Sequence, residues 1–345
     1  MNSKNKINNF FYGANNKLTK IQFLSGNAIK IIAICLMFFD HFNKTILSWY
    51  SQSVLWNLEE IGKMSSEAVV KFNEFVRFQL YPIGSIAFPL FCFLISEGFF
   101  HTKNRKKYFV FMGTFALLSE IPFDVAFFRS DAISDNTFPF YWGYQNVFFT
   151  LLLGLIALWC IEKFNPISKQ KNKKIKARFL QIACVVGLAV TASLIHSDYE
   201  AYGVFLIVAF YLCRKNRFYQ MLAFLLVYMV STNAQPAFPE FTAILILLLY
   251  NGQRGKLRLK YFFYIFYPAH LMILYITTLL LPRFFLQWEI CFIKKYRSNE
   301  INIKFGAMYI RFPIPMIIWQ RKEIIDIIVT IRIQEYSQFR KFDET

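Results

Sequence analysis

Residues 28–49 read AIKIIAICLMFFDHFNKTILSW, an apolar segment in which an aspartate and a histidine, Asp40 and His41, stand side by side. As an α-helix, a segment of this length extends roughly 33 Å, enough to cross the hydrocarbon core of a bilayer. An aspartate at the centre of such a helix costs roughly 2.5–3.5 kcal/mol, and ionisable residues there usually face the protein interior and take part in function. The segment therefore predicts a membrane helix that carries part of a functional site.

The composition also indicates a membrane protein. Of the 345 residues, 56% are hydrophobic and 17% are charged, and the mean hydropathy is +0.36. A soluble domain carries about 25% charged residues. The formal net charge of +18 would suggest nucleic-acid binding in a soluble protein. Here the basic residues lie in short loops between apolar segments, so we expect the lipid bilayer, and no nucleic acid, as a partner.

Nine apolar segments predict the fold class, an all-α, polytopic helical bundle in the membrane. Three of them have only about 14 or 15 apolar residues, so about nine transmembrane helices, and between eight and ten, are expected. The segments are 28–50, 82–100, 108–128, 145–164, 179–195, 200–213, 218–231, 237–251 and 261–282. Residues 51–81 contain apolar residues near helical spacing, which predicts a helix lying at the outer interface.

The chain divides into three parts by this pattern. Residues 1–27 form an N-terminal segment without the apolar stretch and cleavage site of a signal peptide. Residues 28–282 form the membrane domain. Residues 283–345 form a tail for which the sequence predicts no role.

Loop charge predicts the orientation. The N-terminal segment and the loops at 101–107, 162–178, 214–217 and 251–260 together contain 22 basic residues, whereas the alternate loops contain four. Basic loops are retained on the cytoplasmic side, so we expect a multi-pass protein with a cytoplasmic N-terminus.

Polar groups recur at a similar depth in several predicted helices. At 1.5 Å per residue, His41 and Glu120 lie roughly 20 Å and 18 Å from the cytoplasmic ends of their helices, and His270 lies about 15 Å into the last one. The outer half of the membrane is also expected to contain Asp124, Asn146, His196 and Asp198. A cavity opening outward, or a water-filled centre, would explain this shared depth.

Histidine with carboxylates is a general-base constellation for acyl or proton transfer. Asp40 has an alternative interpretation, an ion pair with Lys44 at i,i+4. His41 is about 100° around the helix from Asp40, so its orienting partner is expected on another helix, with Glu120 or Asp198 preferred. The predicted catalytic residues are His41, Asp40, Glu120 and Asp198, and the predicted substrate-binding residues are Arg77, Asn146, Tyr199 and His270.

Other common sites have no signature in the sequence. No phosphate-binding glycine loop, dinucleotide fingerprint, zinc-protease motif or serine-hydrolase motif is present. The four histidines lack the paired spacing of metal ligands, so no metal is expected.

Six stretches of the chain, in this order, resemble the TraX family, named for conjugal-transfer proteins linked to N-terminal acetylation of pilin. They are SGNAIKIIAICLMFFDHF (25–42), FPLFCFLISEGFFHTKNRKKY (88–108), LLSEIPFD (117–124), GYQNVFFTLLLGL (143–155), DYEAYGVFLIVAFY (198–211) and KYFFYIFYPAHL (260–271). That family resembles the type-3 membrane acyltransferases, which use cytoplasmic acyl-CoA and a membrane-embedded histidine to acylate acceptors beyond the membrane.

The resemblance implies a bacterial inner-membrane acyltransferase with His41 as the base and Asp40 in support. Its donor would be acetyl-CoA, and its outer-face acceptor a pilin terminus, a glycan or a lipid-linked sugar. The basic loops would suit the phosphates of coenzyme A, although no specific binding residue is predicted. Where the family places an arginine before Phe-Pro-Leu-Phe, this chain has Gly84-Ser85, with Arg77 as a substitute.

Two other functions remain open from the residues alone. Buried Asp, Glu and His also form the proton relays of transporters, so a proton-coupled permease is the alternative. A non-catalytic membrane scaffold is the third; it would tolerate loss of Asp40 and His41 equally.

Overall fold

The computed structural model describes residues 18–60, 62, 64–165, 171–256, 260–297, 303–305 and 308–310. The chain separates into two compact units, divided between Leu280 and Leu281. Most of the predicted tail and most of the N-terminal segment lie outside the described residues. In the second unit, β1 (Ile303–Phe305) and β2 (Met308–Ile310) form an antiparallel pair.

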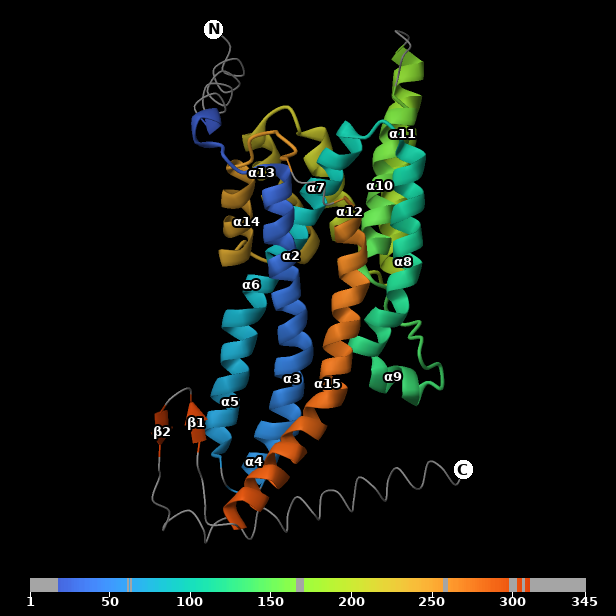
Figure 1. Ribbon diagram of the computed structural model, residues 1–345. Helices are drawn as coiled ribbons and strands as arrows, with labels where there is room; N and C mark the ends of the chain where they lie inside the picture. Colours follow the sequence, from blue (N-terminus) through green and yellow to red (C-terminus); the bar gives the residue numbers. More distant parts are fainter. Residues whose placement is uncertain are drawn as a thin grey trace. The chain divides into compact units, whose positions relative to one another are not determined.

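The first unit is built from helices (Figure 1). Two long helical runs contain π-helical turns, which are labelled η2 to η4. The first run comprises α2 (Gly26–Phe42), η2 (Asn43–Leu47), α3 (Ser48–Tyr50), η3 (Ser51–Leu55) and α4 (Trp56–Glu60). The second comprises α5 (Ser66–Phe75), η4 (Val76–Leu80), α6 (Tyr81–Ser85) and α7 (Ala87–His101).

A short 3-10 helix, η1 (Thr19–Ile21), precedes the first run. The remaining helices follow the second run in chain order. They are α8 (Arg105–Phe127), α9 (Arg129–Ser134), α10 (Val147–Lys163), α11 (Lys171–Leu194), α12 (Glu200–Leu212), α13 (Arg217–Thr232), α14 (Phe238–Leu248) and α15 (Lys260–Arg297). α15 continues across the division between the units.

Every predicted span coincides with a helix, but nine transmembrane helices are not confirmed. Among the described residues, five helices are long and apolar enough to cross a membrane: Gly26–Leu55, Ser66–His101, Arg105–Phe127, Asn172–Leu194 and Tyr261–Pro282. The helices Glu200–Leu212 and Phe238–Leu248 are apolar but shorter. Their length falls below the roughly 20 residues that a spanning helix needs.

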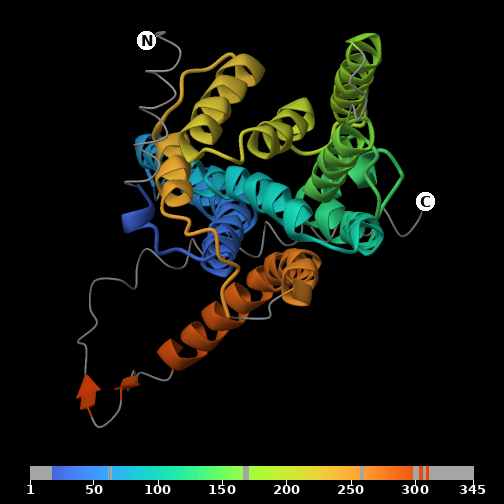
Figure 2. The same ribbon diagram turned by 90° about the horizontal axis from the view of Figure 1, so that it is seen from above.

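The core of the first unit lies around α7 and α12. α7 runs through the middle of the helices (Figure 2) and packs against α2, α10 and α12. Phe93 of α7 and Phe210 of α12 are fully buried, and their rings meet edge to face at 5.6 Å. A side chain on Gly203 of α12 would collide with Thr150 and Phe88, so α12 can approach its neighbours closely only because this position is glycine.

One end of the bundle contains a group of basic residues, and we call it the basic end. They are Lys103, Arg105, Lys106, Lys107, Lys163, Arg214 and Lys215. α2 and α8 begin there and α7, α10 and α12 end there (Figure 1). The start of α2 is attached to the loop after α14, because Gly26 N–H donates to Gln253 O (2.7 Å) and Asn27 N–H donates to Arg254 O (3.0 Å).

Residues 51–81 contain the predicted helix, α5, which continues directly into η4, α6 and α7. Its position at the outer interface stays a prediction. α5 is linked to the preceding run by the Tyr50–Phe72 ring contact (5.9 Å) and by a hydrogen bond from Ser51 to Asn73 (2.5 Å). Ring packing across the two runs thus favours a helical hairpin.

Candidate functional site

Two histidines from distant parts of the chain meet inside the bundle. His41 Nδ1, at the end of α2, lies 2.7 Å from His270 Nε2 of α15, and both side chains are buried. The ring planes are nearly parallel, at 3°. His270 Nδ1 in turn lies 2.7 Å from the carbonyl oxygen of Phe266, one helical turn earlier.

These contacts fix the tautomers of a neutral pair. A carbonyl oxygen only accepts, so His270 Nδ1 must carry the proton that it donates to Phe266 O. His270 Nε2 then has a lone pair and accepts from His41 Nδ1–H. His41 Nε2 is left as an unprotonated nitrogen, and it has no hydrogen bond within the described part of the chain. An imidazole held in this way is a pre-oriented proton acceptor.

Aromatic rings surround the pair. Phe127 and Tyr267 approach His41 edge to face, at 5.3 and 5.9 Å between centroids, and Phe266 stacks on His270 at 4.7 Å. Little water can reach such an environment, so electrostatic interactions within it are stronger than in solvent.

Asp40 pairs with Lys44 one turn along the same helix, which confirms the alternative interpretation from the sequence. Lys44 Nζ donates to Asp40 Oδ2 at 2.7 Å, and the Asp40 side chain is 10% exposed against 44% for Lys44. Behind Asp40 stands Gly84 of α6. A Cβ atom on Gly84 would lie 2.5 Å from Asp40 Cβ and from Oδ1, so α6 holds the carboxylate against Lys44.

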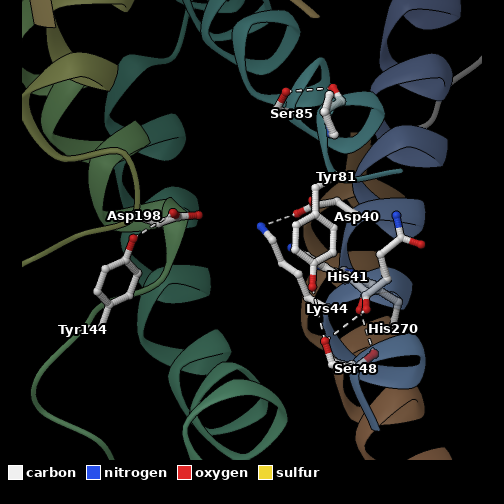
Figure 3. Close-up of polar contacts among 12 residues, drawn as sticks. Asp40, His41, Lys44, Ser48, Tyr81, Ser85, Tyr144, Asp198 and His270 are labelled. Carbon is white, nitrogen blue, oxygen red and sulfur yellow. Dashed lines mark hydrogen bonds and ion pairs between the residues drawn. The ribbon is translucent and has the colours of Figure 1, made fainter. Parts of the chain in front are cut away.

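Lys44 also faces a second carboxylate. Figure 3 shows its ammonium group directed across the site toward Asp198, which lies in the loop before α12 and interacts with it electrostatically. Tyr144 O–H donates to Asp198 Oδ1 at 3.1 Å. Burial raises the pKa of Asp198 to about 6, and the charge of Asp40 adds to the shift, although Lys44 and Tyr144 oppose it.

The loop that carries Asp198 is fixed by backbone bonds. Gln145 N–H donates to His196 O (3.1 Å), and Asp198 N–H donates back to Gln145 O (2.9 Å). Thr150 also donates to the carbonyl of Asp198.

Tyr199 follows Asp198 with a left-handed backbone (φ 66°), and its ring stacks on Phe88 at 3.5 Å between centroids. Of the predicted substrate-binding residues, Tyr199 is thus adjacent to the site.

Glu120 and Asn146 form a separate polar centre. Glu120 Oε1 accepts from the backbone N–H of Asn146 (3.0 Å) and from its side-chain amide. Asn146 Nδ2 also donates to Ala116 O (2.8 Å), and its Oδ1 accepts from Phe148 N–H at the start of α10. Glu120 therefore anchors the capping residue of α10.

The partner of His41 Nδ1 is His270, instead of the expected Glu120 or Asp198.

Two further candidates lie apart from the histidine pair. Arg77 is exposed on η4, and its guanidinium lies over the neighbouring Phe78 ring, 5.6 Å from the centroid. His196 is exposed beside Glu200, 3.5 Å away.

The structure adds residues that the sequence analysis did not assign to the site. Tyr81 of α6 contacts Ser48 at 3.3 Å, one turn beyond Lys44 (Figure 3). Tyr144 and Gly84 contact the two carboxylates. The i,i+4 spacing of Asp40, Lys44 and Ser48 is a signal for one polar helix face, whereas nothing local marks Gly84 or Tyr144. Among the described residues, no group of three or more His, Cys, Asp or Glu side chains is arranged to hold a metal ion.

Several helices that are long and apolar enough to cross a membrane, together with a buried polar site, indicate a membrane protein. The sequence profile described as TraX protein matches residues 25–278, and the chain therefore belongs to the TraX family. The probable fimbrial assembly protein FimC, serogroup H1, of Dichelobacter nodosus is 26% identical over 212 residues, covering 56% of this chain and 80% of that protein. No solved structure matches the chain.

Proposed function

We propose that this protein is a membrane acyltransferase that moves an acetyl group from acetyl-CoA to an acceptor at the outer face of the bacterial inner membrane. The observation that supports this best is the directed chain from Phe266 O through His270 to His41, which leaves His41 Nε2 as a base in an apolar setting. A general base must present an unprotonated atom to the proton that it takes, and the fixed tautomer of His41 provides one.

In the proposed reaction, His41 Nε2 takes the proton from the amine or hydroxyl of the acceptor. The acceptor nitrogen or oxygen attacks the thioester carbonyl carbon, and the carbon–sulfur bond then breaks. The thiolate leaves with the proton that His41 acquired, so the imidazole returns neutral. His270 orients His41 and stabilises the imidazolium through its Nε2 lone pair.

Lys44 supplies the positive charge in this proposal. Its ammonium, held by Asp40, would stabilise the oxyanion that forms on the thioester carbonyl. Asp198, opposite Lys44 in Figure 3, would bind the acceptor. The family membership and the name of the fimbrial assembly relative favour a pilus-related acceptor, with pilin as the first to test.

A proton-coupled transporter remains the alternative to be tested. The histidine chain ends at the carbonyl of Phe266, which cannot accept a proton and pass it on. This geometry favours a local base over a through-going proton path.

The test is transfer of radiolabelled acetyl from acetyl-CoA in membrane vesicles that contain pilin. Wild-type protein is expected to label the acceptor, and His41→Ala to reduce labelling by at least 100-fold at equal membrane abundance. His101→Ala, an exposed histidine at the basic end, is the matched control. Full labelling by His41→Ala would exclude this mechanism, and proton uptake without acyl-CoA dependence would favour the transporter.

A further inference from the structure

The basic end contains a cluster of side chains that the proposed chemistry at His41 does not use. Arg105, at the start of α8, forms an ion pair with Glu162 at the end of α10. The hydroxyl of Tyr211, near the end of α12, donates to the same carboxylate. Arg214 follows two residues after α12 and donates to Tyr211 O at 2.8 Å. One connected set of contacts thus joins three helix ends.

Aromatic rings hold both guanidinium groups. Arg105 lies over the ring of Phe99, 4.5 Å from its centroid. Arg214 lies against two rings, Tyr211 at 4.2 Å and Phe100 at 5.0 Å. Cation–π contacts of this kind restrict a guanidinium while leaving its N–H edge able to donate. The two arginines are therefore oriented before any ligand arrives.

The charge of this set is not balanced. The set contains two guanidinium groups and one carboxylate, Glu162, which pairs with Arg105, so the set carries one excess positive charge. The adjacent loop adds exposed lysines, among them Lys103 and Lys106. Retention of basic loops on one side of a membrane requires only charge. It does not require planar guanidinium groups held by three rings. Membrane orientation alone therefore does not explain this arrangement.

We propose that Arg105 and Arg214 form a binding site for a phosphate group. Arginine binds phosphate oxygens through two parallel N–H donors, a geometry that lysine lacks. Two sources offer this chemistry: the nucleotide end of acyl-CoA, which rests on the proposed function, and the headgroup of an anionic phospholipid.

The position of the site favours a long ligand. α8 runs from Arg105 to Phe127, roughly 34 Å, and the Phe127 ring contacts His41. A molecule that is held at Arg105 and reacts near His41 must carry its phosphates far from its reactive end. Acyl-CoA has this form, with phosphates at one end and the thioester at the other.

The first arm of the test measures binding of adenosine 3′,5′-bisphosphate to the detergent-purified full chain by isothermal titration. Saturable binding is expected, weakened about tenfold, or ~1.4 kcal/mol, by Arg214→Lys and by Arg105→Lys. These variants keep the charge, so topology is preserved, whereas the planar guanidinium is lost with its paired donors and its ring contacts. Arg178→Lys on α11, whose guanidinium donates to Gln181, is the matched control and should bind as the wild type does.

The second arm repeats the measurement in nanodiscs of phosphatidylcholine, with and without phosphatidylglycerol. If phosphatidylglycerol is retained by wild type through purification, lost by Arg214→Lys, and displaces the nucleotide, the site is assigned to a lipid headgroup. Equal affinity of wild type and both lysine variants for both ligands, or no binding of either by folded protein, would overturn the site. Neither arm measures acetyl transfer. The binding result therefore tests the phosphate site even if the protein proves not to transfer acetyl groups.

Discussion

Gly84 and Asp40 are in direct contact: a Cβ atom at position 84 would lie 2.5 Å from both Cβ and Oδ1 of Asp40. The resemblance to the TraX family led us to expect an arginine near this position. With Asp40 placed as it is, a side chain at 84 has no room. The cation beside Asp40 comes instead from Lys44, within the same helix.

Gly84→Ala is expected to displace the Asp40 carboxylate and separate it from Lys44. Overpacking of this kind costs about 1–3 kcal/mol, so both thermal stability and acetyl transfer should fall. Gly187→Ala in α11, where the added methyl group meets nothing within 4 Å, is the control and should be neutral or stabilising. Equal behaviour of the two variants would contradict the close contact.

His270 should act through the tautomer of His41. His270→Leu removes the acceptor for His41 Nδ1–H and is expected to lower kcat by about 100-fold or more, with KM little changed. His270→Gln can present its amide oxygen to the same N–H and should recover part of the rate. If His270→Leu shows the wild-type pH–rate profile and kcat, the histidine pair is structural only.

Asp40 and Lys44 should show strong energetic coupling. Lys44→Met leaves the Asp40 charge uncompensated, and Asp40→Asn leaves Lys44 with Asp198 alone, so each variant reduces stability. The double variant should lose less than the sum of the two. A double-mutant cycle measures this coupling. Glu67→Gln with Lys71→Met, an exposed pair of the same spacing, provides the comparison and should give under about 1 kcal/mol.

Glu120 should prove structural. Glu120→Ala removes the acceptor for two donors of Asn146 and is expected to cost about 1–3 kcal/mol in stability. Glu120→Gln retains an acceptor oxygen and should keep most of the activity. A stable but inactive Glu120→Gln variant would restore the catalytic role predicted from the sequence.

Asp198 gives the stability a specific pH dependence. Its folded pKa of about 6 exceeds the unfolded value of roughly 3.9. Between about pH 4 and pH 6, the folded state therefore keeps a proton on Asp198 that the unfolded state has released. This proton binding stabilises the folded state at low pH, and the stabilisation is lost as the pH rises through about 6. Melting temperatures at pH 5 and pH 7 should differ less in Asp198→Asn than in the wild type. If the two proteins show the same difference in melting temperature, a group other than Asp198 causes the pH dependence.

The sequence predicted the helices well because long apolar segments need no distant information. It also predicted the Asp40–Lys44 pair, since i,i+4 neighbours on one helix are local. Membrane crossing is harder to predict: α12 and α14 are apolar but only 13 and 11 residues long, and burial against neighbours can explain such composition without a full span.

The partner of His41 could not be predicted for a different reason. His41 and His270 are separated by 229 positions, and their contact depends on how α2 and α15 pack. Depth along each helix placed them in one layer, but depth does not specify rotation about the helix axis. Glu120 has a similar depth and faces Asn146 instead.

The π-helical turns have a consequence for comparing relatives of this chain. A π turn closes its hydrogen bond over five residues where an α turn uses four, so it contains one additional residue. η2 directly follows α2, whose last two residues are His41 and Phe42, and η4, which packs against η2, directly precedes α6. A relative shorter by one residue in each of these two segments could keep both helix faces in phase. Paired single-residue gaps at 43–47 and 76–80 are therefore the length variation that this architecture can absorb.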